Sequence, residues 1–146
     1  MAITSAICNS FKQEVLQAIH NFTASSGNTF NLALYTSSAT LNKSTTAYTT
    51  SNEISNTSGS AYTAKGKALT SVTPALSTDT ACCDFADISF TSASFTANGC
   101  LIFNDSATGD PAVCAIAFGS DKTVTSGTFT IQFPTADASN AIIRIA

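Results

Sequence analysis

The sequence predicts a mainly β protein: a compact β-sandwich or jelly-roll-like domain with one amphipathic helix near its N-terminus. Three observations support this fold class. Residues 99–146 read as four strands in close succession, separated by turn-rich links. Two of these strands are near-continuous apolar runs, as expected for strands covered on both faces. Only residues 5–22 show helical periodicity, and a length of 146 residues suits a single domain, 1–146.

The predicted helix spans residues 5–22, with Ser5 or Thr4 as its cap. Its apolar residues recur at the spacing of one buried stripe. That stripe packs on the domain's own sheet or on a neighbouring subunit, and nothing in the pattern separates the two. His20 falls in the last turn, where it can meet the free carbonyls and the negative end of the helix dipole. The stripe consists of Ile7, Phe11, Val15, Ile19 and Phe22.

A first strand is expected at residues 30–36, because Phe30, Leu32 and Leu34 alternate with other residues along one face. Residues 37–60 then form a long polar tract with few apolar anchors. We expect an exposed loop there, which is either a contact loop or a mobile solvated one. The anchors are Leu41, Tyr48 and Ile54.

Residues 62–146 make up the main β region. Pro74 predicts an edge strand or a bulge, since proline cannot donate to a sheet ladder. Asn98-Gly99 is the strongest tight-turn dipeptide, and residues 119–122 read as a further turn. A break is expected near residues 86–87. The strands expected are residues 62–64, 68–76, 80–90, 94–97, 99–103, 112–118, 128–133 and 141–145.

The chain carries few charges. Charged residues make up 10% of it, the net charge is −3 and the estimated pI is 4.7. Its six basic residues do not cluster, so no nucleic-acid partner is expected. Such a surface is weakly protected against association. The chain is therefore either a stable solitary protein with a Ser/Thr-rich coat or, as we favour, one that packs against copies of itself or a partner.

No residue pattern points to an enzyme, a cofactor or a metal. His20 has no nucleophile or orienting carboxylate in a recognisable motif. Residues 104–110 loosely resemble a calcium loop but lack its terminal Glu, so a turn between strands is favoured. The five cysteines show no CxxC spacing and read as buried free thiols, with adjacent Cys82 and Cys83 pointing to opposite faces. No secretory signal or apolar membrane span is seen, so we expect synthesis in a cytosol and no membrane partner.

Taken end to end, the chain resembles small virion proteins of tailed bacteriophages, especially those of cyanobacteria and marine bacteria. In role, the nearest comparison is with capsid decoration, or cement, proteins. The Cys82-Cys83 pair departs from the group. The stretches that carry the resemblance are residues 1–14, 32–41, 68–72, 84–87, 118–123 and, most distinctively, 130–146.

The resemblance implies a structural role without catalysis. A decoration protein sits on the outer surface of the head and clamps major capsid subunits together, so the implied partners are the phage major capsid protein and further copies of this chain, in a trimer at lattice symmetry points. The implied location is the virion, after synthesis in the host cytoplasm. The alternative is a tail or tail-fibre component that adsorbs to a host surface. A small hydrolase of the particle is the least favoured function, for want of residues. The sequence leaves the interface residues unknown.

Overall fold

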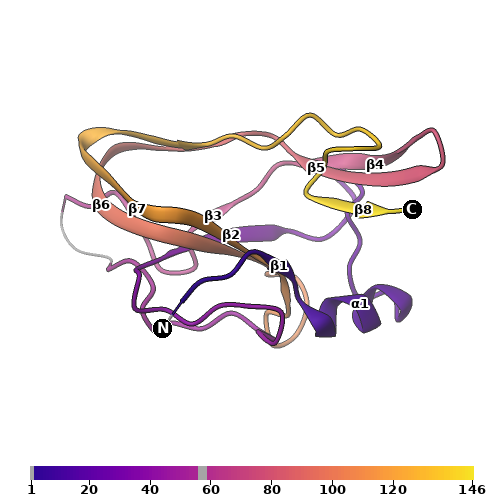
Figure 1. Ribbon diagram of the computed structural model, residues 1–146, viewed down its shortest axis with the longest axis horizontal. Coiled ribbons are helices and arrows are strands. Elements are labelled where there is room, and N and C mark those ends of the chain that lie inside the picture. The colour runs from indigo at the N-terminus through magenta and orange to yellow at the C-terminus, as the bar shows by residue number, and fades with distance from the viewer. Residues whose placement is uncertain (1, 56–58) are drawn as a thin grey trace.

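The computed structural model describes residues 2–55 and 59–146 (Figure 1). They form two antiparallel sheets, of five strands in the order β1-β7-β6-β2-β3 and of three strands in the order β4-β5-β8. This confirms a mainly β, sandwich-like fold with one N-terminal helix. The elements are β1 (Ala6–Ile7), α1 (Asn9–Leu16), β2 (Phe30–Tyr35), β3 (Lys67–Ala68), β4 (Ser71–Ser77), β5 (Thr80–Phe85), β6 (Ile88–Asn104), β7 (Ala112–Ile131) and β8 (Ile143–Ile145).

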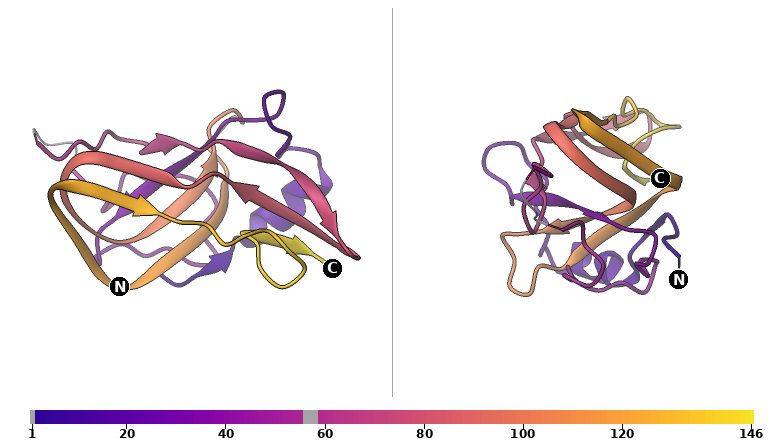
Figure 2. Two further views of the ribbon diagram at one scale, coloured as in Figure 1. Left: turned by 90° about the horizontal axis from the view of Figure 1, so that it is seen from above. Right: turned by 90° about the vertical axis from the view of Figure 1, so that its left-hand side faces the viewer.

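The long β6–β7 ribbon supplies parts of both layers. The end of β6 and the start of β7 lie in the same layer as β2. Figures 1 and 2 show the ribbon bending at one end of the molecule and returning above that layer. The bend coincides with a shift in register, from Gly99↔Ala117 to Ala97↔Lys122, which leaves residues 118–121 of β7 as a bulge. Bulges of this kind bend a strand and increase its twist.

Two predicted turns are therefore wrong. The Asn98-Gly99 dipeptide lies inside β6, where a Cβ atom on Gly99 would stand 2.6 Å from the Ile116 carbonyl oxygen. Glycine is needed there for close packing. The expected turn at 119–122 lies inside β7, where Gly119 supplies a φ of +79° for the bulge. Consequently, the strands expected at 94–97 and 99–103 are one strand, as are those expected at 112–118 and 128–133.

The predicted helix 5–22 is wrong at both ends. Residues 6–7 pair with β7 as β1, and the helix begins after Cys8, which caps it without a side-chain hydrogen bond. It ends after Leu16, because Ala18 adopts a φ of +58°. Ser5 does not cap; its hydroxyl oxygen accepts a hydrogen bond from the backbone N–H of Ala117. Only Phe11 of the helical residues is buried, so the predicted stripe is divided among a strand, a helix and a loop.

The loop expected at residues 37–60 is exposed over much of its described length, as predicted, but buried anchors hold it on the domain. Its anchors Leu41 and Ile54 are buried, and Thr4 N–H donates to the Leu41 carbonyl at 2.8 Å. Residues 56–58 lie outside the described part of the chain. The strand expected at 62–64 is absent; Tyr62 instead lies buried in a loop. Its hydroxyl donates to Glu53 Oε1 at 2.7 Å and accepts from the Leu34 N–H at 2.9 Å.

The core lies between and around the layers. The near-continuous apolar runs of β6 and β7 are buried on both faces, as predicted. The returning ribbon and the three-stranded sheet lie over one face, and the N-terminal segment with the 37–55 loop lies under the other (Figure 1). Stacked Phe22 and Phe30, 4.3 Å apart, contact Phe85 of the second sheet. The expected break near 86–87 separates β5 from β6, and the strand containing Pro74, β4, is an irregular edge strand; both predictions are confirmed.

Candidate interaction surface

His20 has a structural role, because its ring connects two elements of the fold through hydrogen bonds. It lies beyond α1, so its expected position in the helix's last turn is wrong, and its side chain is fully buried. Its Nε2 atom is 2.8 Å from Glu14 Oε2, and its Nδ1 atom is 3.2 Å from Asn104 Nδ2. The Asn104 amide nitrogen also donates to the Ile19 carbonyl oxygen, which assigns Nδ1 as an acceptor and Nε2–H as the donor to Glu14. Both ring nitrogens thus hold α1 and the following loop to the end of β6.

The 104–110 segment is the turn between β6 and β7, as favoured from the sequence. Its two carboxylates converge on an ammonium group, since Lys65 Nζ lies 2.8 Å from both Asp105 Oδ1 and Asp110 Oδ2. The hydrogen bond to Asp105, followed by that to Asp110, raises the pKa of Lys65 above its usual value. A lysine therefore occupies the point where a cation would otherwise be held.

A second polar cluster fixes the packed loop. The Glu53 carboxylate accepts hydrogen bonds from the hydroxyls of Tyr48 and Tyr62 and from the Lys65 backbone N–H. Burial, helped by the hydrogen bond to Glu53, raises the pKa of Tyr48 to about 12, and burial raises that of Tyr62 further. Both phenols are therefore neutral donors at neutral pH. Tyr62 attaches the loop to Leu34 of β2, and the Tyr48 ring stacks on Phe103 of β6.

All five cysteines are free and buried, as predicted. Cys83 belongs to the core, whereas Cys82 Sγ lies 3.1 Å from the Asp137 carbonyl oxygen on the outer side of the second sheet, so the adjacent pair does face opposite ways. Burial raises the pKa of Cys100 to about 12. Among residues 2–55 and 59–146, no group of three or more potential ligands is placed to hold a metal ion. No helix within these ranges is long and apolar enough to span a membrane.

Exposed apolar side chains gather at one end of the molecule. Leu16, near the end of α1, is 89% exposed, and Leu76 on β4 is 74% exposed. Figures 1 and 2 place α1 and the three-stranded sheet at the same end. Large apolar side chains that are exposed at one end of a soluble domain offer a surface for interaction. We call this surface the apolar end; its members are Leu16, Ile19, Val72, Leu76 and Ile145.

An inner hollow of about 110 Å³ opens between α1 and the sheet at this end. The sheet register places Leu76, Ala81 and Ile145 in one cross-strand row at its rim. The residues that line it are apolar apart from His20 and the two cysteines. They comprise Phe11, Val15, His20, Phe22, Pro74, Ala81, Cys82, Cys83, Ile143 and Ile145.

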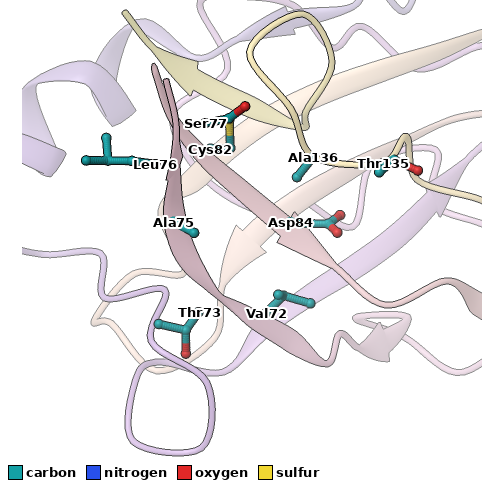
Figure 3. Close-up of a pocket in the computed structure, with 9 residues that line it drawn as sticks. All are labelled: Val72, Thr73, Ala75, Leu76, Ser77, Cys82, Asp84, Thr135 and Ala136. Carbon is teal, nitrogen blue, oxygen red and sulfur yellow. The ribbon is translucent and has the colours of Figure 1, made fainter. Parts of the chain in front are cut away.

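An outer hollow of about 310 Å³ lies on the opposite side of β4 and β5 (Figure 3). Asp84 is its only charged lining residue. In Figure 3 the Asp84 carboxylate projects between Val72 and the 135–136 segment, while Leu76 points away from the hollow. The lining residues are Val72, Thr73, Ala75, Leu76, Ser77, Cys82, Asp84, Thr135 and Ala136.

The strand between the two hollows is suited to side-chain contact. β4 is an edge strand, but Pro74 has no N–H and the register shifts between Val72 and Ala75. Both features hinder the addition of a further strand. A partner would therefore contact the side chains of this surface and its two hollows.

The sequence did not identify this surface. Leu76 and Ile145 lay in predicted strands, but an apolar residue in a strand carries no sign of whether a second layer covers it. Pro74 was the one usable signal, because it marked β4 as an edge.

No family model, no curated protein and no solved structure matches the chain.

Proposed function

We propose that this chain is a structural protein of a tailed-phage virion, a head decoration protein that binds the outer capsid surface and stabilises contacts between major capsid subunits. The observation that carries the proposal is the apolar end: exposed Leu76, Leu16 and Ile145 beside two hollows. Burial of such side chains against a partner is the main source of association free energy.

The sparse charge of the chain supports the same role. Six basic and nine acidic side chains share an accessible surface of 7315 Å². Burial of an unpaired ion at an interface is costly, so a surface with few ions loses little when it is covered. Attachment through apolar and hydroxyl groups also depends little on salt. The proposal includes self-association, as a trimer at lattice symmetry points, and location on the outer head after synthesis in the host cytoplasm.

Copy number tests this proposal. Quantitative mass spectrometry of purified virus particles would measure the ratio of this chain to the major capsid protein. Head decoration predicts hundreds of copies per particle. A handful to a few dozen copies would instead favour a tail or tail-fibre component, for which an apolar docking end is equally suitable. Absence from the particle would overturn both.

A further inference from the structure

We propose that the Asp84 carboxylate in the outer hollow binds a basic side chain, lysine or arginine, presented by the protein on which this chain docks. This inference rests on the proposed function, because it names a contact made by the docking surface. It concerns one residue whose charge has no evident use within the fold.

Aspartate is an unusual residue at position 84 of β5. β5 is otherwise largely buried, and aspartate is unfavourable in strands. Its one hydrogen bond comes from the backbone N–H of its own neighbour, Phe85, at 2.8 Å. In the described ranges it forms no ion pair, in contrast to Asp105 and Asp110. The fold therefore gains little from the carboxylate, which is consistent with a role outside the chain.

The chain's own nearby cation is already engaged. Arg144 pairs with Cys82 across the sheet, but its Nη1 atom donates to the Ala138 carbonyl oxygen at 2.7 Å. Lys65 is held by two other carboxylates. The charge in the hollow is therefore left for a cation from another molecule.

The shape and lining of the hollow suit a long basic side chain. Its volume of about 310 Å³ is at the lower end of the range of small-ligand sites, about 300–1,000 Å³. Val72, Ala75 and Ala136 offer apolar walls for a methylene stem, and Asp84 accepts from the charged head. Val72, which lines the hollow and is exposed in the free protein, would exclude water around the ion pair once covered.

Binding to purified heads that lack this chain tests the inference. Asp84→Asn keeps the shape but removes the charge, and Asp79→Asn, in the exposed β4–β5 turn, is the matched control. Loss of a charge-assisted hydrogen bond predicts binding weaker by about tenfold or more for Asp84→Asn and no change for the control. Wild-type binding should also weaken more with added salt than that of Asp84→Asn. Equal binding by Asp84→Asn and wild type would overturn the inference.

A titration without heads separates this inference from the proposed function. Nα-acetyl-lysine methylamide should shift the amide NMR signals of Val72, Asp84 and Thr135, and its Nε-acetylated form, which lacks the charge, should not. Equal shifts with both probes, or none, would overturn a preference for basic side chains. Failure of wild-type protein to bind heads would instead overturn the proposed function, and the titration would still decide the role of Asp84. Unchanged circular dichroism would show that both variants fold.

Discussion

Replacement of Leu76 by alanine should weaken docking without unfolding the protein. Leucine has three more carbons than alanine, and each buried methylene contributes about 0.8 kcal/mol, or about 2.4 kcal/mol in total. Leu76 is 74% exposed in the free protein, so a partner that covers it fully adds about 1.8 kcal/mol from these carbons. The expected result is an approximately 20-fold increase in Kd. The part already buried accounts for only about 0.6 kcal/mol of folding free energy.

Co-sedimentation of labelled protein with heads lacking this chain would give the Kd values. Leu76→Met is the control, since a swap that conserves volume should retain most of the binding. Thermal unfolding would show that Leu76→Ala is folded at the assay temperature. Binding by Leu76→Ala at the wild-type Kd would refute the assignment of this surface, and so would an equal loss in Leu76→Met.

Four further outcomes follow from the fold. Gly99→Ala should destabilise the protein by more than about 2 kcal/mol in urea unfolding, since the new Cβ would meet backbone and side-chain atoms within 3 Å, whereas Gly127→Ala, with no atom closer than 3.4 Å, should change stability little. Tyr62→Phe leaves a buried β2 N–H without its hydroxyl acceptor and should cost about 1–3 kcal/mol in the same assay; an unchanged midpoint would contradict the assigned hydrogen bonds. Burial raises the pKa of Cys100, so its thiol should resist alkylation at pH 8 in the native state and react after unfolding, as measured by mass spectrometry; rapid native labelling would contradict its burial. Backbone hydrogen bonds lower the pKa of Asp137, so its contribution to the 137–140 turn should be complete above about pH 4 and lost as the pH falls through the folded-state pKa. The amide NMR signals of this turn would report that loss. In the Asp137→Asn variant these signals should no longer change over this pH range.

The sequence predicted the fold class because the buried strands carry their own signal. The apolar runs of residues 99–103 and 112–118 and the alternation of residues 30–36 depend only on local pattern, and all three lie in strands. The long ribbon was not predictable in the same way. A glycine that turns a chain and a glycine that permits close packing or a bulge look alike in sequence. The difference at Gly99 and Gly119 lies in which strand passes beside them, and this is non-local information.

The N-terminal helix shows the same limit. Ile7, Phe11 and Val15 have helical spacing, yet Ile7 pairs with β7 because that edge of the five-stranded sheet was open to it. The structure also brings His20 into contact with Asn104, which is 84 residues away in the sequence, and no motif predicted this contact. The low charge of the sequence predicted a protein that associates with copies of itself or a partner, but it did not show which residues form the interface. The exposure of Leu76 depends on which strands the returning ribbon covers.

A density map of the intact virus particle would show both where this chain sits and which of its surfaces is buried. We expect copies across the outer head, each with the β4 edge, and Leu76 and Asp84 on its two sides, in contact with a major capsid subunit. A map in which the apolar end faces solvent, or in which the chain is absent from the head, would contradict it.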